Sequence, residues 1–232
     1  MVDHAYLENF KYKHRNPYHE KLTEFSEFVM RDEEAEVHKG KWNSDVFKRD
    51  ARLVVEVGTG YGHFMREYCE NNPDVNFVGM DYRFKRSYEL CKKLERLKID
   101  NYRYLRAKGE RISFLFEDGE VDTLLYFFPD PWPKKRHNKK RLFQAPFLQS
   151  AYQVLKPGGR MFIKTDHDAY YEWMCEVLKD QDQFTISMQT ADLWNEQQDH
   201  FLASFQTKFE KIFLKQGINI KGFELISKKG SH

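Results

Sequence analysis

A carboxylate, an aromatic ring and a cluster of cations lie together between Phe127 and Arg141, a combination typical of an active site that also docks an anionic partner. Prolines at positions 129, 131 and 133 hold Asp130 and Trp132 on a stiff loop. The loop follows an apolar run, and open α/β sheets carry their active sites at the ends of such strands. Six cations follow within eight residues, with no acid among them: Lys134, Lys135, Arg136, Lys139, Lys140 and Arg141. The alternative is a rigid surface turn followed by a solvated basic run.

Residues from Glu56 to Asp81 have the spacing of a nucleoside-cofactor site. Glycines at positions 58, 60 and 62 come directly after an apolar run, where they let the backbone approach a ligand at the start of a helix. Asp81 follows Gly62 by 19 residues, and an acid at about that distance can bind the two hydroxyl groups of a ribose. His63 replaces the last glycine of the dinucleotide fingerprint, so NAD is kept only as an alternative cofactor. The structural alternative is that Asp81 only caps the next helix.

Alternating strands and helices must position these groups. Apolar runs predict seven strands, at 53–57, 75–80, 102–107, 121–128, 160–165, 184–190 and 223–227. Helical patterns run from the glycine loop to about residue 71 and over 83–97, 145–155, 168–179 and 208–216. This alternation indicates an α/β fold, with a mostly parallel seven-stranded sheet and helices on both faces.

The chain is expected to divide into an N-terminal helical and loop extension, residues 1–50, and a catalytic domain, residues 51–229. Within the extension, the spacing of Leu22, Phe25, Phe28 and Val29 predicts a helix near 18–35, with a loop at 39–43. Residues 191–206 are polar, and we expect them to form an irregular, mobile loop. Residues 230–232 are assigned to the remnant of an expression tag.

Composition limits the classes of protein to be considered. The 232 residues suffice for one large domain with a buried core. No apolar run approaches the roughly 20 residues that cross a bilayer, and no signal peptide is evident at the N-terminus, so a cytoplasmic protein is expected. The net charge is only +2, so the six clustered cations form a local docking patch on an otherwise acidic chain. Cys69, Cys91 and Cys175 lack metal-ligand spacing and are expected to be reduced thiols, without a zinc site or a disulfide.

Taken together, these motifs resemble the bacterial tRNA (guanine-N7-)-methyltransferase family. The glycine loop has the form of the first motif of class I S-adenosylmethionine-dependent methyltransferases, and the Pro-Asp-Pro-Trp-Pro-Lys-Lys-Arg-His stretch at 129–137 is specific to the family. The other matching segments follow in the family's order: Gly40-Lys41-Trp42, Lys140-Arg141, Pro157-Gly158-Gly159, Thr165-Asp166 and Thr207-Lys208-Phe209-Glu210. The resemblance implies a Rossmann-like fold and methylation of tRNA at N7 of guanine 46 in the variable loop.

The resemblance also implies roles for individual residues. The cofactor would be S-adenosylmethionine, without a metal ion, and would be bound by Glu56, Gly58, Gly60, Asp81 and Asp130. Asp130 would also be the catalytic residue. The substrate nucleotide would be contacted by Lys134, Asp166, Thr207 and Glu210. tRNA would be the partner, no obligate protein partner is expected, and the enzyme would be a monomer or homodimer. One position departs from the family: Lys108 stands where an acid is usual near the adenine, and a lysine cannot accept the amino proton of adenine.

Several of these roles have plainer alternatives. Thr207 and Glu210 have the spacing of a capping box for the following helix, and Asp166 could cap the helix after the fifth strand. Trp132 would either stack on a base or plug the gap between the loop and the core. For the whole chain, the alternatives are a methyltransferase acting on a protein or small molecule, which would not need the basic run, and a non-catalytic RNA-binding protein that has lost its cofactor.

Overall fold

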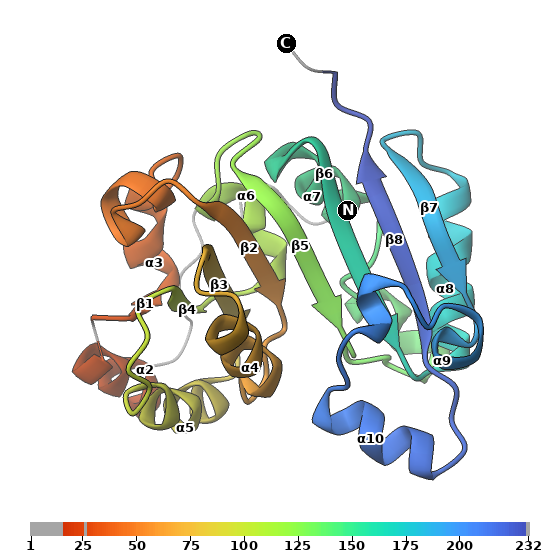
Figure 1. Ribbon diagram of the computed structural model, residues 1–232, viewed down its shortest axis with the longest axis horizontal. Helices are drawn as coiled ribbons and strands as arrows, with labels where there is room; N and C mark the ends of the chain where they lie inside the picture. The colour runs from red at the N-terminus through yellow and green to blue at the C-terminus, as the bar shows by residue number, and fades with distance from the viewer. Residues whose placement is uncertain (1–15, 26, 231–232) are drawn as a thin grey trace.

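A single mixed sheet organises the computed structural model, which describes residues 16–25 and 27–230 (Figure 1). Among these residues, eight strands follow the order β1-β4-β3-β2-β5-β6-β8-β7. Neighbouring strands are parallel except at β8, which is antiparallel to both β6 and β7. The strands are β1 (Val29–Arg31), β2 (Arg52–Val57), β3 (Val75–Asp81), β4 (Tyr102–Arg106), β5 (Val121–Phe127), β6 (Leu155–Thr165), β7 (Phe184–Thr190) and β8 (Lys221–Ser227).

Helices cover both faces of this sheet, as the alternating pattern predicted. One face carries α4 (His63–Asn71) and α5 (Phe84–Leu94), and the other carries α6 (Ile112–Leu115), α7 (Ala145–Val154) and α8 (Asp168–Lys179). Helix α10 (Lys208–Lys215) precedes β8 and projects beyond the end of the sheet in Figure 1. Among the described residues, every helix is too short or too polar to cross a lipid bilayer.

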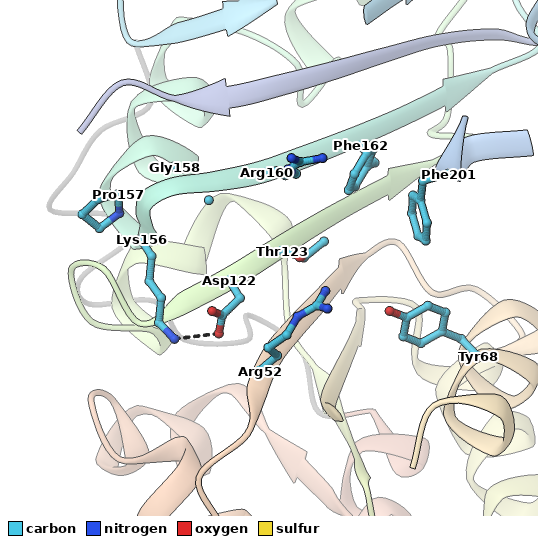
Figure 2. Close-up of a pocket in the computed structure, with 11 residues that line it drawn as sticks. Arg52, Tyr68, Asp122, Thr123, Lys156, Pro157, Gly158, Arg160, Phe162 and Phe201 are labelled. Carbon is cyan, nitrogen blue, oxygen red and sulfur yellow. Dashed lines mark hydrogen bonds and ion pairs between the residues drawn. The ribbon is translucent and has the colours of Figure 1, made fainter. Parts of the chain in front are cut away.

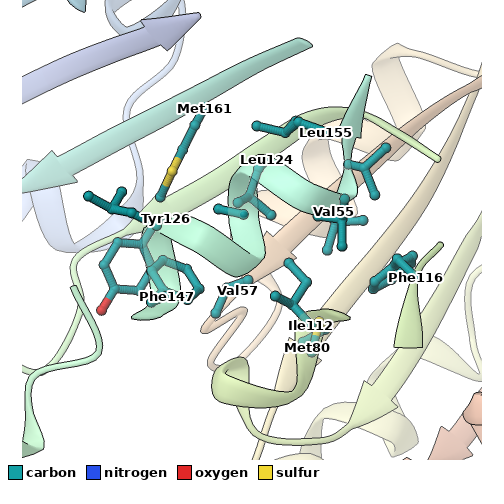
Figure 3. Packing of buried hydrophobic residues seen from close by; sticks show 14 of the residues in the cluster. Val55, Val57, Met80, Ile112, Phe116, Leu124, Tyr126, Phe147, Leu155 and Met161 are labelled. Atoms are coloured by element: carbon teal, nitrogen blue, oxygen red, sulfur yellow. The ribbon is translucent and has the colours of Figure 1, made fainter. Parts of the chain in front are cut away.

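Two hydrophobic cores explain why the strands have nearly continuous apolar sequences. Along β2, Val54 lies in the core under α4 and α5, whereas Val55 lies in the core under α6, α7 and α8. Figure 3 shows the second of these cores, where Leu124 and Met161 lie among the side chains of the covering helices. Strands that are buried on both faces lose the alternation of apolar and polar residues.

The predicted helix over 18–35 is wrong, and the sheet therefore has eight strands rather than seven. The segment forms α2 (Pro17–Lys21), the 3₁₀ helix η1 (Leu22–Phe25), strand β1 and then α3 (Asp32–Ala35). Strand β1 pairs in parallel with the edge of β4, Val29 opposite Tyr104. The two short helical turns and the adjoining strand bury Leu22, Phe25 and Val29, so their spacing imitated one long helix. Residues 1–15 of the expected extension and 231–232 of the expected tag lie outside the described residues.

Two segments expected to be loops contain helical turns. The 39–43 segment leads into the π-helix η3 (Trp42–Phe47). The 191–206 segment contains α9 (Leu193–Glu196) and the 3₁₀ helix η6 (Phe201–Ala203), and it buries Leu193 and Leu202. The backbone N–H of Leu193 donates to the carbonyl of Ile220 at 2.8 Å, so this segment packs on the sheet instead of forming an irregular loop. Two further 3₁₀ turns, η2 (Glu36–His38) and η4 (Gly109–Arg111), and the longer 3₁₀ segment η5 (Lys135–Lys140) complete the described elements.

Candidate active site

A cavity of about 370 Å³ opens at the carboxyl ends of β2, β3, β4 and β5. That volume falls within the roughly 300–1,000 Å³ of small-molecule sites, and this edge of an open α/β sheet is where ligands bind. Apolar side chains and a few charged groups share its wall. Its lining comprises Val57, Gly58, Met80, Asp81, Tyr82, Arg83, Arg86, Ala107, Lys108, Gly109, Glu110, Tyr126, Phe128, Pro129, Asp130, Trp132, Lys140 and Leu142.

The glycine loop after β2 leaves room for a ligand against its backbone. Gly58 has a φ of +90°, and a Cβ added there would have no atom within 4 Å. Gly60 has a φ of +62°, and its N–H donates to Oδ2 of Asp81 at 3.0 Å. Both residues need the left-handed conformation that favours glycine. The loop therefore presents open backbone at the cavity and is tied to the end of β3.

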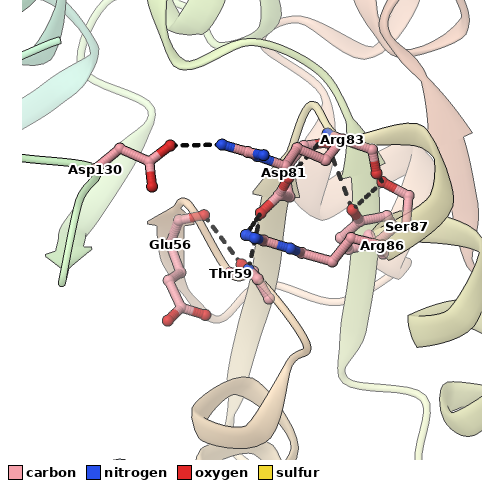
Figure 4. A network of polar contacts seen from close by, with 9 residues as sticks. Glu56, Thr59, Asp81, Arg83, Arg86, Ser87 and Asp130 are labelled. Carbon is pink, nitrogen blue, oxygen red and sulfur yellow. Dashed lines mark hydrogen bonds and ion pairs between the residues drawn. The ribbon is translucent and has the colours of Figure 1, made fainter. Parts of the chain in front are cut away.

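Asp81 connects the glycine loop with the start of α5. Its Oδ1 accepts from the backbone N–H of Arg83 at 2.9 Å, and its Oδ2 accepts from Nη1 of Arg86 at 3.3 Å as well as from Gly60 (Figure 4). Burial raises the pKa of the carboxyl group, while these N–H donors and the charge of Arg86 oppose the rise. Asp81 thus holds the start of α5 and also faces the cavity, so both expectations for it are compatible with the geometry.

Glu56 lies just behind the glycine loop, outside the residues that line the cavity. Its side chain is buried, and its Oε2 has no hydrogen-bond partner among the described residues. Burial, reinforced by the charge of Asp81, raises its pKa to about 8. A buried carboxyl without a partner is costly, so Glu56 could bind a polar or cationic group that approaches the glycine loop.

Asp130 is carried on the strained loop that the prolines predicted. Phe128 and Trp132, on either side of it, both have positive φ values, of +48° and +46°, a conformation that is uncommon and strained for bulky side chains. The N–H of Phe128 donates to the carbonyl of Lys164 at 2.9 Å, which fixes the start of the loop to β6. The carboxylate is 53% exposed and forms an ion pair with Arg83 at 2.8 Å (Figure 4).

Trp132 lines the cavity and also contacts the cationic segment. Its half-buried ring lines the cavity, and it packs edge-on against His137 with a centroid distance of 5.7 Å. The ammonium group of Lys140 lies 4.6 Å from the ring centroid. The ring therefore contributes both to the wall of the cavity and to the base of the cationic segment.

The basic run is only partly a surface patch. Its exposed members include Lys134, Arg136, Lys139 and Lys140. Arg141 is buried, donates to the carbonyl of Pro131 at 2.9 Å and packs over the rings of Tyr170 and Trp173. The expectation that Arg141 belongs to the docking patch is therefore wrong, because this side chain anchors the proline loop.

Asp166 follows β6, beside the strand that leads to Asp130. The two strands pair in parallel, with Phe127 opposite Lys164, so Asp166 and Asp130 follow neighbouring strand ends. The alternative that Asp166 caps α8 is not supported, because the N-cap is His167 and no side chain caps it. Asp166 is half-buried, and its backbone carbonyl accepts from Nζ of Lys221 at 3.0 Å.

Thr207 and Glu210 form the capping box of α10, which confirms that alternative. Thr207 Oγ1 accepts from the N–H of Glu210, and the Oε2 of Glu210 accepts from the N–H of Thr207. Glu210 is fully buried, and its Oε1 pairs with Nζ of Lys164 at 2.8 Å. Both carboxylate oxygens are thus engaged within the protein, so direct contact of Glu210 with a substrate is not what this arrangement provides. Thr207 remains half-exposed.

Charged residues that the sequence patterns missed complete the cavity. Arg83 and Arg86 bind the two carboxylates that the sequence did identify, and Glu110 lines the wall two residues after Lys108. The closeness of the two arginines to Asp81 in the sequence, at the start of a helix, was the available signal, but it did not reveal the partner of Arg83. Glu110 brings a carboxylate to the region where Lys108 departs from the family pattern.

A second cavity, of about 430 Å³, lies toward the amino ends of β2, β5 and β6 (Figure 2). None of the expected site residues lines it. Two of its cations, Lys156 and Arg160, are already paired with Asp122 at 2.7 Å and Glu224 at 2.8 Å. It lies away from the carboxyl ends of the strands and adds nothing to the site built from Asp81 and Asp130.

The three cysteines lie outside the residues that line the cavity. Cys69 and Cys91 are free and buried, and burial raises the pKa of both thiols. Cys175 is free and half-buried. In the described part of the chain, no three side chains of the metal-binding types gather into a group.

Comparison with known proteins identifies the family. The family model described as "Putative methyltransferase" matches residues 50–222. A tRNA (guanine-N(7)-)-methyltransferase from Bdellovibrio bacteriovorus is 34% identical over 199 residues, which cover 85% of this chain and 94% of that protein. A bifunctional glycosyltransferase/methyltransferase from Fusobacterium nucleatum is 33% identical over 90% of this chain, but the chain spans only 32% of that relative's length. The solved 16S rRNA methyltransferase KamB superposes with a TM-score of 0.57, at 17% identity, over 84% of this chain and 94% of that one, which shows a shared fold. The chain belongs to the tRNA (guanine-N7-)-methyltransferase family.

Proposed function

We propose that this protein transfers a methyl group from S-adenosylmethionine to N7 of a guanine in tRNA, at position 46 of the variable loop. The observation that carries the proposal is the meeting of two features at one edge of the sheet. The open glycine loop and Asp81 border one side of the cavity, and the Asp130 loop with its exposed cations borders the other. A site for a nucleoside cofactor thereby lies next to a carboxylate and a phosphate-binding surface. A tRNA substrate also agrees with action in the cytoplasm without an obligate protein partner.

The residues around the cavity fit S-adenosylmethionine. The space against Gly58 admits a ligand at the backbone, and the unpartnered Oε2 of Glu56 is suited to the amino group of the methionine part. Asp81 would hold the ribose hydroxyls, and Glu110 would offer a carboxylate near the adenine of the cofactor. When bound, the cofactor supplies a methyl group carried on a positively charged sulfur.

The reaction requires the protein to align N7 with the methyl group and to place negative charge near the purine. Guanine N7 has a free lone pair and no proton to lose, so no strong general base is needed. Positive charge moves onto the purine as the methyl group is transferred, and Asp130 stabilises that charge electrostatically. Asp130 and Asp166 also provide acceptors for the N1–H and 2-amino group of guanine, which adenine cannot match. Lys134 and Thr207 are assigned to the substrate nucleotide, and Glu210 supports Thr207 through the capping box.

The direct test is methyl transfer from labelled S-adenosylmethionine to unmodified tRNA, followed by chain cleavage at N7-methylguanosine. Label in the variable loop is the expected result. Label elsewhere in tRNA would retain the class of enzyme but reject position 46. Absence of label while the cofactor binds would reject tRNA as the substrate.

We predict that cofactor affinity rises with pH through Glu56. Its pKa of about 8 means that the carboxyl is protonated at neutral pH. If the cationic cofactor requires the ionised form, binding must release a proton, and affinity should strengthen by up to about tenfold per pH unit between pH 6 and 7.5. Titration calorimetry in buffers of different ionisation enthalpy counts that proton.

The Glu56→Gln variant is the matched control for this pH dependence. It should bind the cofactor weakly and without proton release in the same range. His63, whose pKa is lowered chiefly by burial, and Asp81, whose pKa is raised by burial, are two other ionisable groups at this end of the sheet and are unchanged in this variant. An equal slope in the glutamine variant would assign the released proton to one of those groups and reject the role of Glu56.

We predict that the exposed lysines of the basic run bind phosphates of tRNA. Replacing Lys134, Lys139 and Lys140 with alanine should weaken tRNA binding and reduce the slope of log affinity against log salt by about 0.7–0.9 for each phosphate that is no longer bound. Filter binding over a range of salt concentrations measures both quantities. A control variant that replaces Lys98, Lys179 and Lys228, exposed lysines away from the cavity, should keep the wild-type slope. Equal slopes in the two variants would place the RNA elsewhere.

A further inference from the structure

Arg83 connects the two carboxylates that serve different halves of the site. Its backbone N–H donates to Oδ1 of Asp81 at 2.9 Å, and its guanidinium donates to Oδ2 of Asp130 at 2.8 Å (Figure 4). Asp81 ends β3 and Asp130 follows β5, and β2 lies between these strands in the sheet. Arg83 therefore spans the cavity from the cofactor side to the loop that carries Asp130.

This ion pair has little value for folding. The side chains of Arg83 and Asp130 are 44% and 53% exposed, and ion pairs at such exposure contribute little to stability because water screens them and two side chains must be ordered. The hydrogen bond to Asp130 nevertheless raises the pKa of Arg83, as expected for a guanidinium held against a carboxylate. The contact is better explained by what it does to Asp130.

The contact engages only one oxygen of the Asp130 carboxylate. Oδ2 accepts from Arg83, and no hydrogen bond to Oδ1 is found within the described residues. In Figure 4 the second oxygen is turned away from Arg83, toward the side on which Glu56 lies. An aspartate on an exposed loop would otherwise sample several rotamers, so a single guanidinium contact determines which oxygen is offered to a ligand.

We propose that Arg83 is a positioning residue that binds one oxygen of Asp130 and thereby orients the other toward the purine. The inference rests on the proposed function, because it takes Asp130 as the carboxylate that meets the base. Arg83 itself need not touch the substrate. Asp81 fixes the backbone of Arg83 at the start of α5, and from there the guanidinium reaches the Asp130 loop.

The test combines Arg83→Ala and Asp130→Asn, singly and together, in the full chain. For Arg83→Ala we expect kcat to fall by roughly ten- to a hundredfold, the scale of a misplaced reacting group, with KM for tRNA and cofactor affinity changed by no more than a few-fold. In the Asp130→Asn background, Arg83→Ala should have no further effect on kcat. Arg83→Lys should recover part of the loss, because a lysine retains the charge but not the planar geometry.

Each contrary outcome has a distinct meaning. An equal loss from Arg83→Ala in both backgrounds would show that Arg83 does not act through Asp130 and would overturn the inference. A gain in kcat/KM would overturn it as well, because Arg83 would then be blocking the carboxylate. If the wild-type protein binds cofactor but does not methylate tRNA, the proposed function fails and the inference fails with it. Arg96→Ala, an exposed arginine beyond the other end of α5, is the control and should retain wild-type kinetics.

Discussion

Replacing Asp130 with alanine should lower kcat for methyl transfer by about 100- to 1,000-fold, the usual effect of removing one preorganised electrostatic group from an active site. In the proposed reaction, the carboxylate stabilises the positive charge that develops on the purine. The affinity for tRNA should remain close to that of the wild-type protein, because phosphate contacts generally dominate nucleic-acid affinity and we assign them to the basic run. Single-turnover kinetics with saturating cofactor measure the chemical step, and filter binding measures the affinity.

The control for this prediction is Asp74→Ala. Asp74 is an exposed aspartate in the turn before β3. It lies at the amino end of this strand, opposite the cavity, and its loss should leave kcat unchanged. Asp130→Asn should fall between the two variants, because it retains an acceptor oxygen but not the charge. Near-normal turnover in Asp130→Ala would show that charge at this position is not needed, and the mechanism would have to rest on alignment alone.

Much of the fold could be predicted because its strands are buried on both faces. All seven residues of β3 are buried, and such strands give apolar runs bounded by turns, which are the clearest pattern in a sequence. Strand β1 was missed for the opposite reason. It has three residues, only Val29 is fully buried, and it exists because the edge of β4 is available for pairing. Nothing within Val29–Arg31 contains that information.

The candidate site divides in the same way. Asp81 and Asp130 could be found because their positions at strand ends follow from local spacing. Arg83 could not be assigned, since its partner is 47 positions away in the sequence and the contact depends on how two loops face each other. Arg141 shows the converse error. Its place in a run of cations indicated exposure, but the neighbouring rings of Tyr170 and Trp173 bury it.

The buried pair of Lys164 and Glu210 gives the largest predicted effect on stability. Both side chains are 0% exposed and their charged atoms lie 2.8 Å apart. Lys164 also donates to the carbonyl of Phe205 at 3.2 Å, so the ammonium and the carboxylate depend on each other and on few other groups. Replacing Lys164 with methionine leaves the carboxylate buried without its counter-charge, and we expect a loss of about 3–5 kcal/mol in the free energy of unfolding. Urea unfolding measures this free energy.

The reciprocal variant, Glu210→Gln, should cost less and should depend on pH. Burial already lowers the pKa of Lys164 to about 8, although Glu210 opposes the change, so the lysine can lose its proton when its partner is neutral. Because the folded pKa lies below the ordinary value of 10.5, the unfolded chain binds more protons between these values. The contribution of Lys164 to the free energy of unfolding therefore becomes more favourable as pH rises between these two values. Without the charge of Glu210, the folded pKa of Lys164 should fall further, so the pH range in which the unfolded chain binds more protons extends to lower pH. The loss of stability in Glu210→Gln should therefore be greater at pH 6 than at pH 9.

A double variant separates the ion pair from the capping box. Replacing both residues with methionine removes both charges while filling similar volume, and such exchanges of buried ion pairs are often neutral or stabilising. The double variant should therefore recover most of the loss seen in Lys164→Met but should still lack the bond from the Thr207 N–H to Glu210, worth about 0.5–2 kcal/mol for a helix cap. Lys179→Met, which breaks an exposed pair with Glu176, should cause no measurable change. If Lys164→Met were as harmless as that control, the pair would not be what holds α10 to β6. If the double variant recovers stability but not activity, the polar contacts of the pair must serve the site itself, by fixing Thr207 where α10 begins.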